Sequence, residues 1–141
     1  MQRYRQRISG PLLDRIDLHI EVPSVDYREI ASERAEEASP AIRERVGQAR
    51  QRQQARFASD KKITCNARMS SRAIKQHCRL TSESQDLIRI AMTELNLSAR
   101  AYDRILKVSR TIADLAGADS IVPEHVSEAI QYRTFDRTLW V

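Results

Sequence analysis

Glycine is scarce in this chain, and no apolar run is long. Of the 141 residues only three are glycine, at positions 10, 47 and 117. A phosphate-binding loop of the G-x-x-x-x-G-K-[S/T] kind needs two glycines five residues apart, so no such loop can be assembled here. No stretch approaches the roughly 18 apolar residues of a transmembrane helix, and no apolar signal segment follows Met1. We therefore expect no membrane partner and a cytoplasmic location.

Cysteine and aromatic residues are also few. Cys65 and Cys78 form no Cys-x-x-Cys pair, and we expect free thiols in a reducing compartment. Adding His77 gives three candidate ligands whose spacing matches no common zinc pattern, so no metal site is predicted. His19, His77 and His125 are scattered singly, which indicates no pairing of a nucleophile with a base. Aromatic residues make up 5% of the chain, and few are therefore available to stack on nucleic-acid bases.

Positive charge is concentrated in the middle of the chain. Residues 41–80 contain 11 lysines and arginines against two acidic residues, whereas the remainder contains 13 basic and 17 acidic residues. The net charge of +5 thus combines a block of +9 with flanks of −4. Such a block suits a polyanionic partner, and a solvated helix face is the alternative. The candidate contacts for DNA are Arg43, Arg50, Arg52, Arg56, Lys61 and Lys62.

Helical periodicity dominates the chain from Ser39 to Tyr132. Ser39 is predicted to cap the first helix, whose narrow apolar seam runs to Phe57. Ser98 and Gly117 are predicted to be the N-cap and the C′ stop of the strongest helix. The short connections favour a helical bundle. We predict helices over residues 39–57, 70–79, 82–95, 98–116 and 123–131.

A short stretch before this bundle has the pattern of a β-strand. Apolar residues at positions 16, 18, 20 and 22 alternate with polar ones until Pro23. A lone strand leaves its backbone groups without partners, and no second strand pattern is present. We therefore expect the end of a larger protein, with residues 1–38 poorly ordered in isolation. The fold class is mainly α, a helical bundle preceded by one strand and a loop from a truncated α/β core.

Two arginines stand where a guanidinium group could reach a bound nucleotide. Arg15 directly precedes the predicted strand and could project toward a neighbouring subunit. Arg100 lies in the first turn of a predicted helix and faces away from its apolar side. A guanidinium stays charged and pairs bidentately with phosphate oxygens. The alternatives are salt bridges, from Arg15 to Asp14 or Asp17 and from Arg100 to Asp103 or Glu94.

Residues 7–23, RISGPLLDRIDLHIEVP, resemble the corresponding segment of the magnesium-chelatase-like AAA+ ATPases of the bacterial ComM/YifB type. Residues 97–108, 113–117 and 126–133 resemble the same family in the same order. The resemblance implies a C-terminal fragment: residues 1–38 are the end of an ATPase core, and residues 39–141 are its helical lid. It also implies that Arg15 is an arginine finger acting in trans and that Arg100 is a sensor-2 arginine, with Arg104 and Arg110 on nearby turns.

The same resemblance implies what the full-length protein does. ATP and Mg²⁺ are expected as its cofactors, and a homohexamer as its assembly. The fragment lacks the Walker motifs, so we expect it to be monomeric, to bind no cofactor and to be inactive alone. The motor is expected to be a ComM-like DNA helicase that acts in recombination and natural transformation. The alternatives are a magnesium chelatase ATPase subunit, a basic helical module that binds nucleic acid, and a protein-interaction bundle.

Overall fold

The computed structural model describes residues 12, 15–20, 22–25, 27, 37–60 and 62–133, and this part of the chain is mainly helical. The bounds of the helices differ from the predicted ones by at most two residues. No helix among the described residues is long and apolar enough to cross a membrane. The elements are α4 (Ser39–Arg56), the 3₁₀ turn η1 (Asn66–Arg68), α5 (Ser71–His77), α6 (Ser82–Glu94), α7 (Ala99–Leu115) and α8 (Pro123–Gln131).

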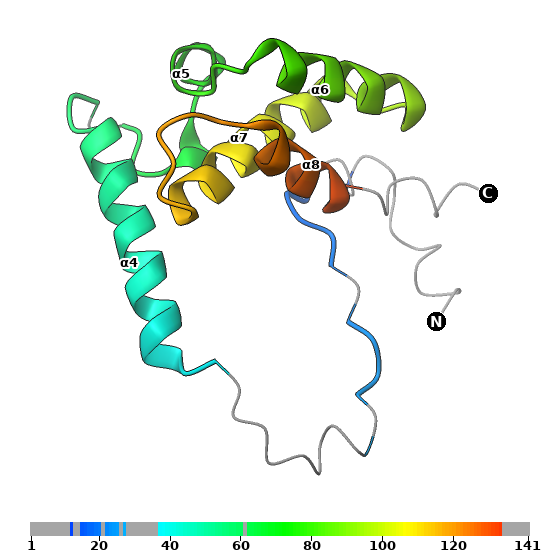
Figure 1. Ribbon diagram of the computed structural model, residues 1–141. Coiled ribbons are helices and arrows are strands. Elements are labelled where there is room, and N and C mark those ends of the chain that lie inside the picture. Colours follow the sequence, from blue (N-terminus) through cyan, green and yellow to red (C-terminus); the bar gives the residue numbers. More distant parts are fainter. Residues whose placement is uncertain are drawn as a thin grey trace.

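Helix α7 is the centre of the bundle. It contacts α4, η1, α5 and α8, and α8 also packs against α6. In Figure 1, α4 borders α7 on one side, and α5 and α6 cover α7 and α8 from above. Ile105 of α7 and Val126 of α8 are fully buried in the shared core. Helical spacing predicts that positions 102, 105, 106, 109, 112, 113 and 116 form the inner face of α7. Most of these positions are buried or partly buried, whereas Tyr102 and Ala116 are exposed.

Three helices begin at serine or threonine caps. The sequence predicts Ser98, and it leaves Ser70 or Ser71 and Thr81 or Ser82 as alternatives for the other two. The side chains of Ser70, Thr81 and Ser98 each accept a hydrogen bond from the backbone N–H three residues later. Each cap satisfies one of the N–H groups that a helix start leaves unpaired. The prediction that Ser39 caps α4 is wrong by one residue, because Ala38 holds the cap position without a side-chain bond.

Helix α7 ends in a Schellman motif at the glycine that the sequence predicts as its stop. Gly117 has a φ of 72°, which costs little for a residue without a Cβ. The Gly117 N–H donates to the Asp114 carbonyl oxygen at 3.2 Å, and the Ala118 N–H donates to Ala113 at 2.8 Å. These are the two hydrogen bonds of the motif. They turn the chain sharply toward α8.

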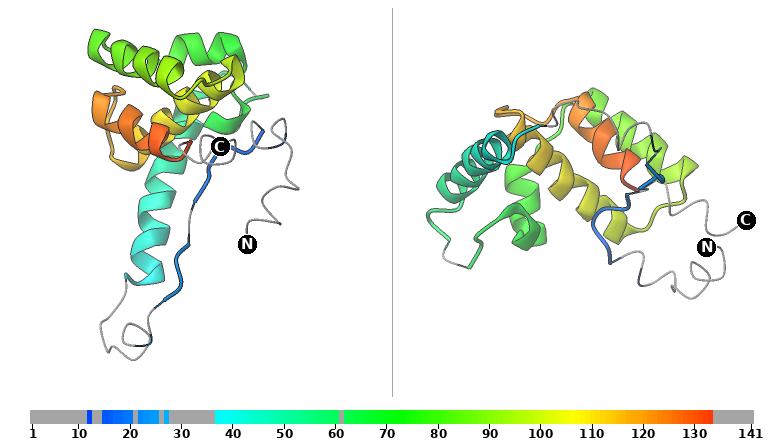
Figure 2. Two further views of the ribbon diagram at one scale, coloured as in Figure 1. Left: turned by 90° about the vertical axis from the view of Figure 1, so that its right-hand side faces the viewer. Right: turned by 90° about the horizontal axis from the view of Figure 1, so that it is seen from below.

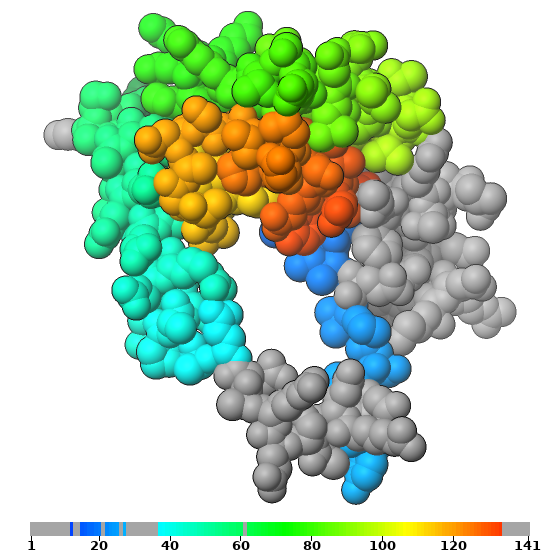
Figure 3. Space-filling model, viewed as in Figure 1, coloured from blue at the N-terminus to red at the C-terminus, as the bar shows by residue number. Residues whose placement is uncertain are grey.

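Helix α4 is packed in its C-terminal half only. Ala49, Gln53 and Phe57 are buried, as the predicted seam requires, but Ile42 and Val46 are 39% and 45% exposed. The reason is visible in Figures 1 and 3, where the N-terminal half of α4 extends past the remainder of the bundle. The apolar seam of α4 therefore extends past the other helices that the structure describes.

The predicted strand is not formed in the described residues 15–20 and 22–25. A strand needs a partner strand for its ladder, and here the backbone bonds to the end of the bundle instead. The His19 N–H donates to the Tyr132 carbonyl oxygen at 3.0 Å, and Figures 1 and 2 show the segment beside α8. The predicted poor order of residues 1–38 stays a prediction, because most of them lie outside the described residues.

Candidate functional site

Arg100 lies in the first turn of α7, two residues after the Ser98 cap, and it is exposed. Neither of the acidic residues considered as its partners, Asp103 and Glu94, forms an ion pair with it. No other described carboxylate lies within ion-pair distance of its guanidinium. The group is thus presented at a helix N-terminus, where the helix dipole favours an anion.

Arg104, one turn further along α7, holds the opening segment in place. It forms an ion pair with Asp17, so Asp17 is engaged by Arg104, whereas Asp14 lies outside the described residues. Arg15 is exposed, two residues before Asp17, and its N–H donates to the Leu12 carbonyl oxygen at 3.0 Å. Since residues four apart share one helix face, the pair brings the Arg15 segment to the end of α7 that carries Arg100.

Arg133 is a second anchor of this segment, and no pattern in the sequence marked it. Its side chain is 1% exposed, and its Nη1 donates to the Ile16 carbonyl oxygen. Leu18 and Ile20 then line a groove of about 300 Å³ with Val108 and other α7 residues. A buried arginine is uncommon unless it is paired, and here it bonds to the backbone of the segment that carries Arg15.

A buried ionic cluster fixes α4 and η1 against α7. The Asp114 carboxylate accepts hydrogen bonds from both terminal nitrogens of Arg56, one of them at 2.7 Å, and from Asn66 Nδ2 at 2.8 Å. The Arg110 Nε lies 3.2 Å from the same carboxylate. Burial raises the pKa of Asp114, but the hydrogen bonds from Arg56 and Asn66 and the nearby positive charges outweigh it and lower the pKa below its usual value.

Arg110, one of the alternatives for the nucleotide sensor, is engaged inside the bundle. It is 3% exposed, and it donates to the carbonyl oxygens of Asp119 at 2.8 Å and Ala118 at 2.6 Å. Burial lowers its pKa against the opposing charge of Asp114. These bonds hold the loop after α7. Of the arginines of α7, Arg100 and Arg104 lie toward its N-terminal end and are less buried than Arg110.

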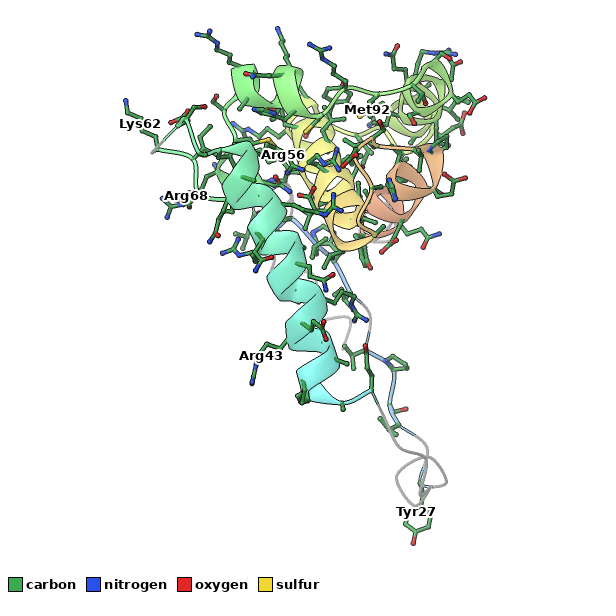
Figure 4. All side chains as sticks on the ribbon, turned by 60° about the vertical axis from the view of Figure 1, so that its left-hand side comes forward. Tyr27, Arg43, Arg56, Lys62, Arg68 and Met92 are labelled. Atoms are coloured by element: carbon green, nitrogen blue, oxygen red, sulfur yellow. The ribbon has the colours of Figure 1, made fainter. Side chains whose placement is uncertain are left out.

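The predicted DNA contacts that the structure describes do not lie on one surface. Arg56 is engaged by Asp114, and Arg52 forms an ion pair with Asp119 at 3.2 Å. Arg50 is exposed and makes a hydrogen bond to Cys65. Figure 4 shows Arg43 far along α4 from Lys62, with Arg56 turned toward the interior. Lys61 lies outside the described residues.

The two cysteines are free thiols in different surroundings. Burial raises the pKa of the Cys78 thiol to about 11. Burial also acts to raise the pKa of Cys65, but hydrogen bonds from the Arg68 backbone and the Arg50 side chain outweigh it and lower the pKa. Within the described part of the chain, no three His, Cys, Asp or Glu side chains are grouped as metal ligands.

Comparison with known families decides what this arrangement belongs to. Residues 36–133 match the family model of the C-terminal region of magnesium chelatase, subunit ChlI. The chain belongs to the magnesium chelatase ChlI family. Residues 1–30 match the model of magnesium chelatase, subunit ChlI. The first match covers the bundle and its arginines on α7, and the second covers Arg15.

Bacterial relatives match almost the whole chain. Over 99% of its own length, this chain is 41% identical to competence protein ComM of Haemophilus influenzae. Over 97% of its own length, it is 42% identical to the uncharacterized protein YifB of Salmonella typhimurium. An uncharacterized protein of Mycobacterium tuberculosis is 33% identical over 94%. The chain covers 26% of each of these proteins, about a quarter of their length.

Proposed function

We propose that this chain is the lid and arginine-finger segment of an ATP-driven AAA+ ATPase of the ChlI family. Residues 39–141 form the lid, and residues 1–38 form the end of the ATPase core. The observation that carries the proposal is the ion pair between Arg104 and Asp17. It gathers Arg15 and the exposed Arg100 at one end of α7, so both can serve a nucleotide bound outside this chain.

ATP and Mg²⁺ are the cofactors that the family implies for the whole protein, and ATP supplies the phosphoryl group whose negative charge has to be stabilised during transfer. The residues here fit the phosphate part of that task, because exposed guanidinium groups pair with phosphate oxygens. Among the described residues none are grouped as ligands for Mg²⁺. This chain therefore positions positive charge, and the remaining parts of the site lie in the longer protein.

Each arginine has its own role in this proposal. Arg15 contacts the nucleotide of a neighbouring subunit in trans, and Arg100 contacts a nucleotide from the lid side. Arg104 and Arg133 act through the backbone and Asp17, since they hold the segment from which Arg15 projects. They are positioning residues. A guanidinium that is already held in place stabilises the charge of the transferring phosphoryl group more effectively. No free energy is then lost in ordering the side chain at the moment of reaction.

For the whole protein we propose a cytoplasmic homohexameric motor that acts on DNA as a helicase in recombination and transformation. The likeness to competence protein ComM over 99% of this chain supports it. The family description, magnesium chelatase, favours a second candidate, an ATPase subunit that drives Mg²⁺ insertion into protoporphyrin. ATPase activity that rises with DNA and not with the porphyrin substrate would select the motor.

The finger is tested by subunit mixing in the full-length protein. Arg15→Ala subunits are mixed with subunits whose Walker lysine is replaced, and ATP turnover is followed against the mixing ratio. Trans-acting arginines contribute about 10³- to 10⁵-fold to the rate. Each ATP site whose neighbouring subunit lacks Arg15 should therefore show no measurable ATP turnover. Arg89→Ala is the matched control, since Arg89 is exposed on α6 and pairs with Asp86. Turnover that does not depend on Arg15 in the neighbouring subunit contradicts the assignment.

A further inference from the structure

Three exposed arginines of the described chain have a carboxylate partner on the surface. Arg45 pairs with Glu37 at 2.7 Å, Arg52 pairs with Asp119 at 3.2 Å and Arg89 pairs with Asp86 at 2.8 Å. Each of these pairs neutralises a positive charge where it stands. Some other exposed basic side chains have no such carboxylate partner among the described residues.

A further group of exposed basic side chains lies in the run from residue 62 to residue 82, which contains no aspartate or glutamate. Five basic side chains of this run are exposed, and none has a described carboxylate within ion-pair distance. We call them the α5 basic surface. They are Lys62, Arg68, Arg72, Lys75 and Arg79.

Arg72 lies beside the loop that precedes Lys62, whereas Arg79 follows α5 and lines a separate hollow beside α6. Arg72 and Lys75 lie three residues apart on α5 and are therefore neighbours on its surface, and α5 is anchored by the buried Ile74. Lys62 and Arg68 extend outward from the loop and the 3₁₀ turn beside it (Figure 4). The residues are thus held by ordered elements.

A polar hollow of about 280 Å³ runs beside this surface, between the loop after α4 and α5. Arg72 and Gln76 line it from α5, and Ser59 lines it from the loop. Asp60 is its one acidic lining residue, and an Asp60 carboxylate oxygen accepts the Lys62 N–H at 3.0 Å. The hollow therefore offers several hydrogen-bond donors within a positive field.

The chemistry of the surface points to a phosphate backbone rather than to a protein. Among the described residues from 47 to 89 no large hydrophobic side chain is exposed, and stable protein interfaces depend on such anchors. No aromatic ring is exposed there either, which removes the stacking platform that single strands use. Unneutralised lysines and arginines on ordered elements are what sequence-independent binding to a duplex requires.

We propose that the α5 basic surface binds the phosphate backbone of duplex DNA without reading its sequence. The proposal deepens the motor function, because it names the surface of the lid that touches the nucleic acid. It differs from the contacts that the sequence predicts on α4, where Arg52 and Arg56 are already paired. Bound DNA would release counterions from several phosphates, and this makes the affinity strongly dependent on salt.

The test compares two triple variants of this chain that lose the same charge. Arg72→Gln, Lys75→Gln and Arg79→Gln remove three members of the surface. The matched control, Arg45→Gln, Arg52→Gln and Arg89→Gln, removes three exposed arginines that have carboxylate partners. Binding to a fluorescent 20-base-pair duplex of arbitrary sequence is measured by anisotropy over a range of salt concentrations, and far-UV circular dichroism confirms that each variant is folded.

We expect the surface variant to bind at least tenfold more weakly at 0.1 M salt. The slope of log K against log salt should be shallower by about 0.9 for each lost contact, whereas the control should stay close to the unmodified chain. Equal weakening in both variants would show an effect of net charge alone and would overturn the proposal. So would an absence of duplex binding at 50 mM salt, tighter binding to a single strand, or displacement of the duplex by polyglutamate of equal charge. ATP hydrolysis takes no part in this assay, so its outcome is independent of the subunit-mixing experiment.

Discussion

Replacing Asp114 by asparagine should destabilise the bundle strongly at neutral pH. The Asp114 side chain is fully buried, and the side chains of Arg56 and Arg110 beside it are 16% and 4% exposed. Removal of the carboxylate charge would leave two arginines facing each other with little water to screen them. Breaking one partner out of a buried ion pair costs about 3–5 kcal/mol. The NH2 group of the new asparagine would also face the N–H groups of Arg56, and two donors form no hydrogen bond with each other.

The magnitude is large compared with the stability of a domain of this size. Small domains unfold with about 5–15 kcal/mol, so the variant should lose between a fifth of that stability and all of it. A loss of 3 kcal/mol corresponds to a fall in Tm of roughly 12 °C or more for about 100 residues. Urea unfolding followed by far-UV circular dichroism measures the change in free energy of unfolding.

Asp119→Asn is the matched control, because Asp119 carries the same group at the surface. Its side chain is 98% exposed, and it pairs with Arg52 at 3.2 Å. Exposed pairs contribute about 0–1 kcal/mol, so this change should be almost silent. A loss below about 1 kcal/mol in Asp114→Asn, close to that of the control, would refute the reasoning that the buried cluster holds α4 against α7.

The cost of Asp114→Asn should also depend on pH. The folded pKa of Asp114 is lowered, so its carboxylate contributes stability above the unfolded pKa, which is about 3.9 for aspartate. That contribution is lost as the pH falls through the folded pKa. The difference in stability between the variant and the unmodified chain should therefore shrink below about pH 3.9. An unchanged difference at low pH would show that the carboxylate charge is not the cause.

Three smaller predictions test single features of the fold. Gly117→Ala should cost about 1–2 kcal/mol in urea unfolding, since a Cβ there would meet no atom closer than 3.6 Å and only the left-handed backbone is penalised; no loss would argue against that backbone. Ser98→Ala should cost about 1 kcal/mol by removal of the α7 cap, and a Ser98→Thr variant should recover most of it. Iodoacetamide at pH 8 should alkylate Cys65 well before Cys78, because burial raises the pKa of the Cys78 thiol to about 11 while hydrogen bonds outweigh burial and lower that of Cys65; the reverse order by mass spectrometry would contradict both directions.

The helices and their ends were predictable because they depend on neighbours in sequence. The caps at Ser70, Thr81 and Ser98 act over three residues, and the stop at Gly117 depends on the conformation of a single residue. Apolar spacing likewise predicted most of the buried apolar positions of α7, although Tyr102 and Ala116 are exposed. The strand before the bundle was the exception, since a strand is completed by a partner that a local pattern does not supply.

The sequence by itself determined the helical bundle, its boundaries and its resemblance to the magnesium-chelatase-like ATPases. Only the tertiary structure decided which charges remain available for a ligand. Arg56 meets Asp114 across 58 positions, and Arg133 meets Ile16 across 117. Pairings over such distances depend on how the helices pack, and they turned two arginines inward. For the same reason Arg52 and Arg56 of α4 are neutralised by carboxylates, whereas the exposed basic residues of α5 have no described carboxylate within ion-pair distance.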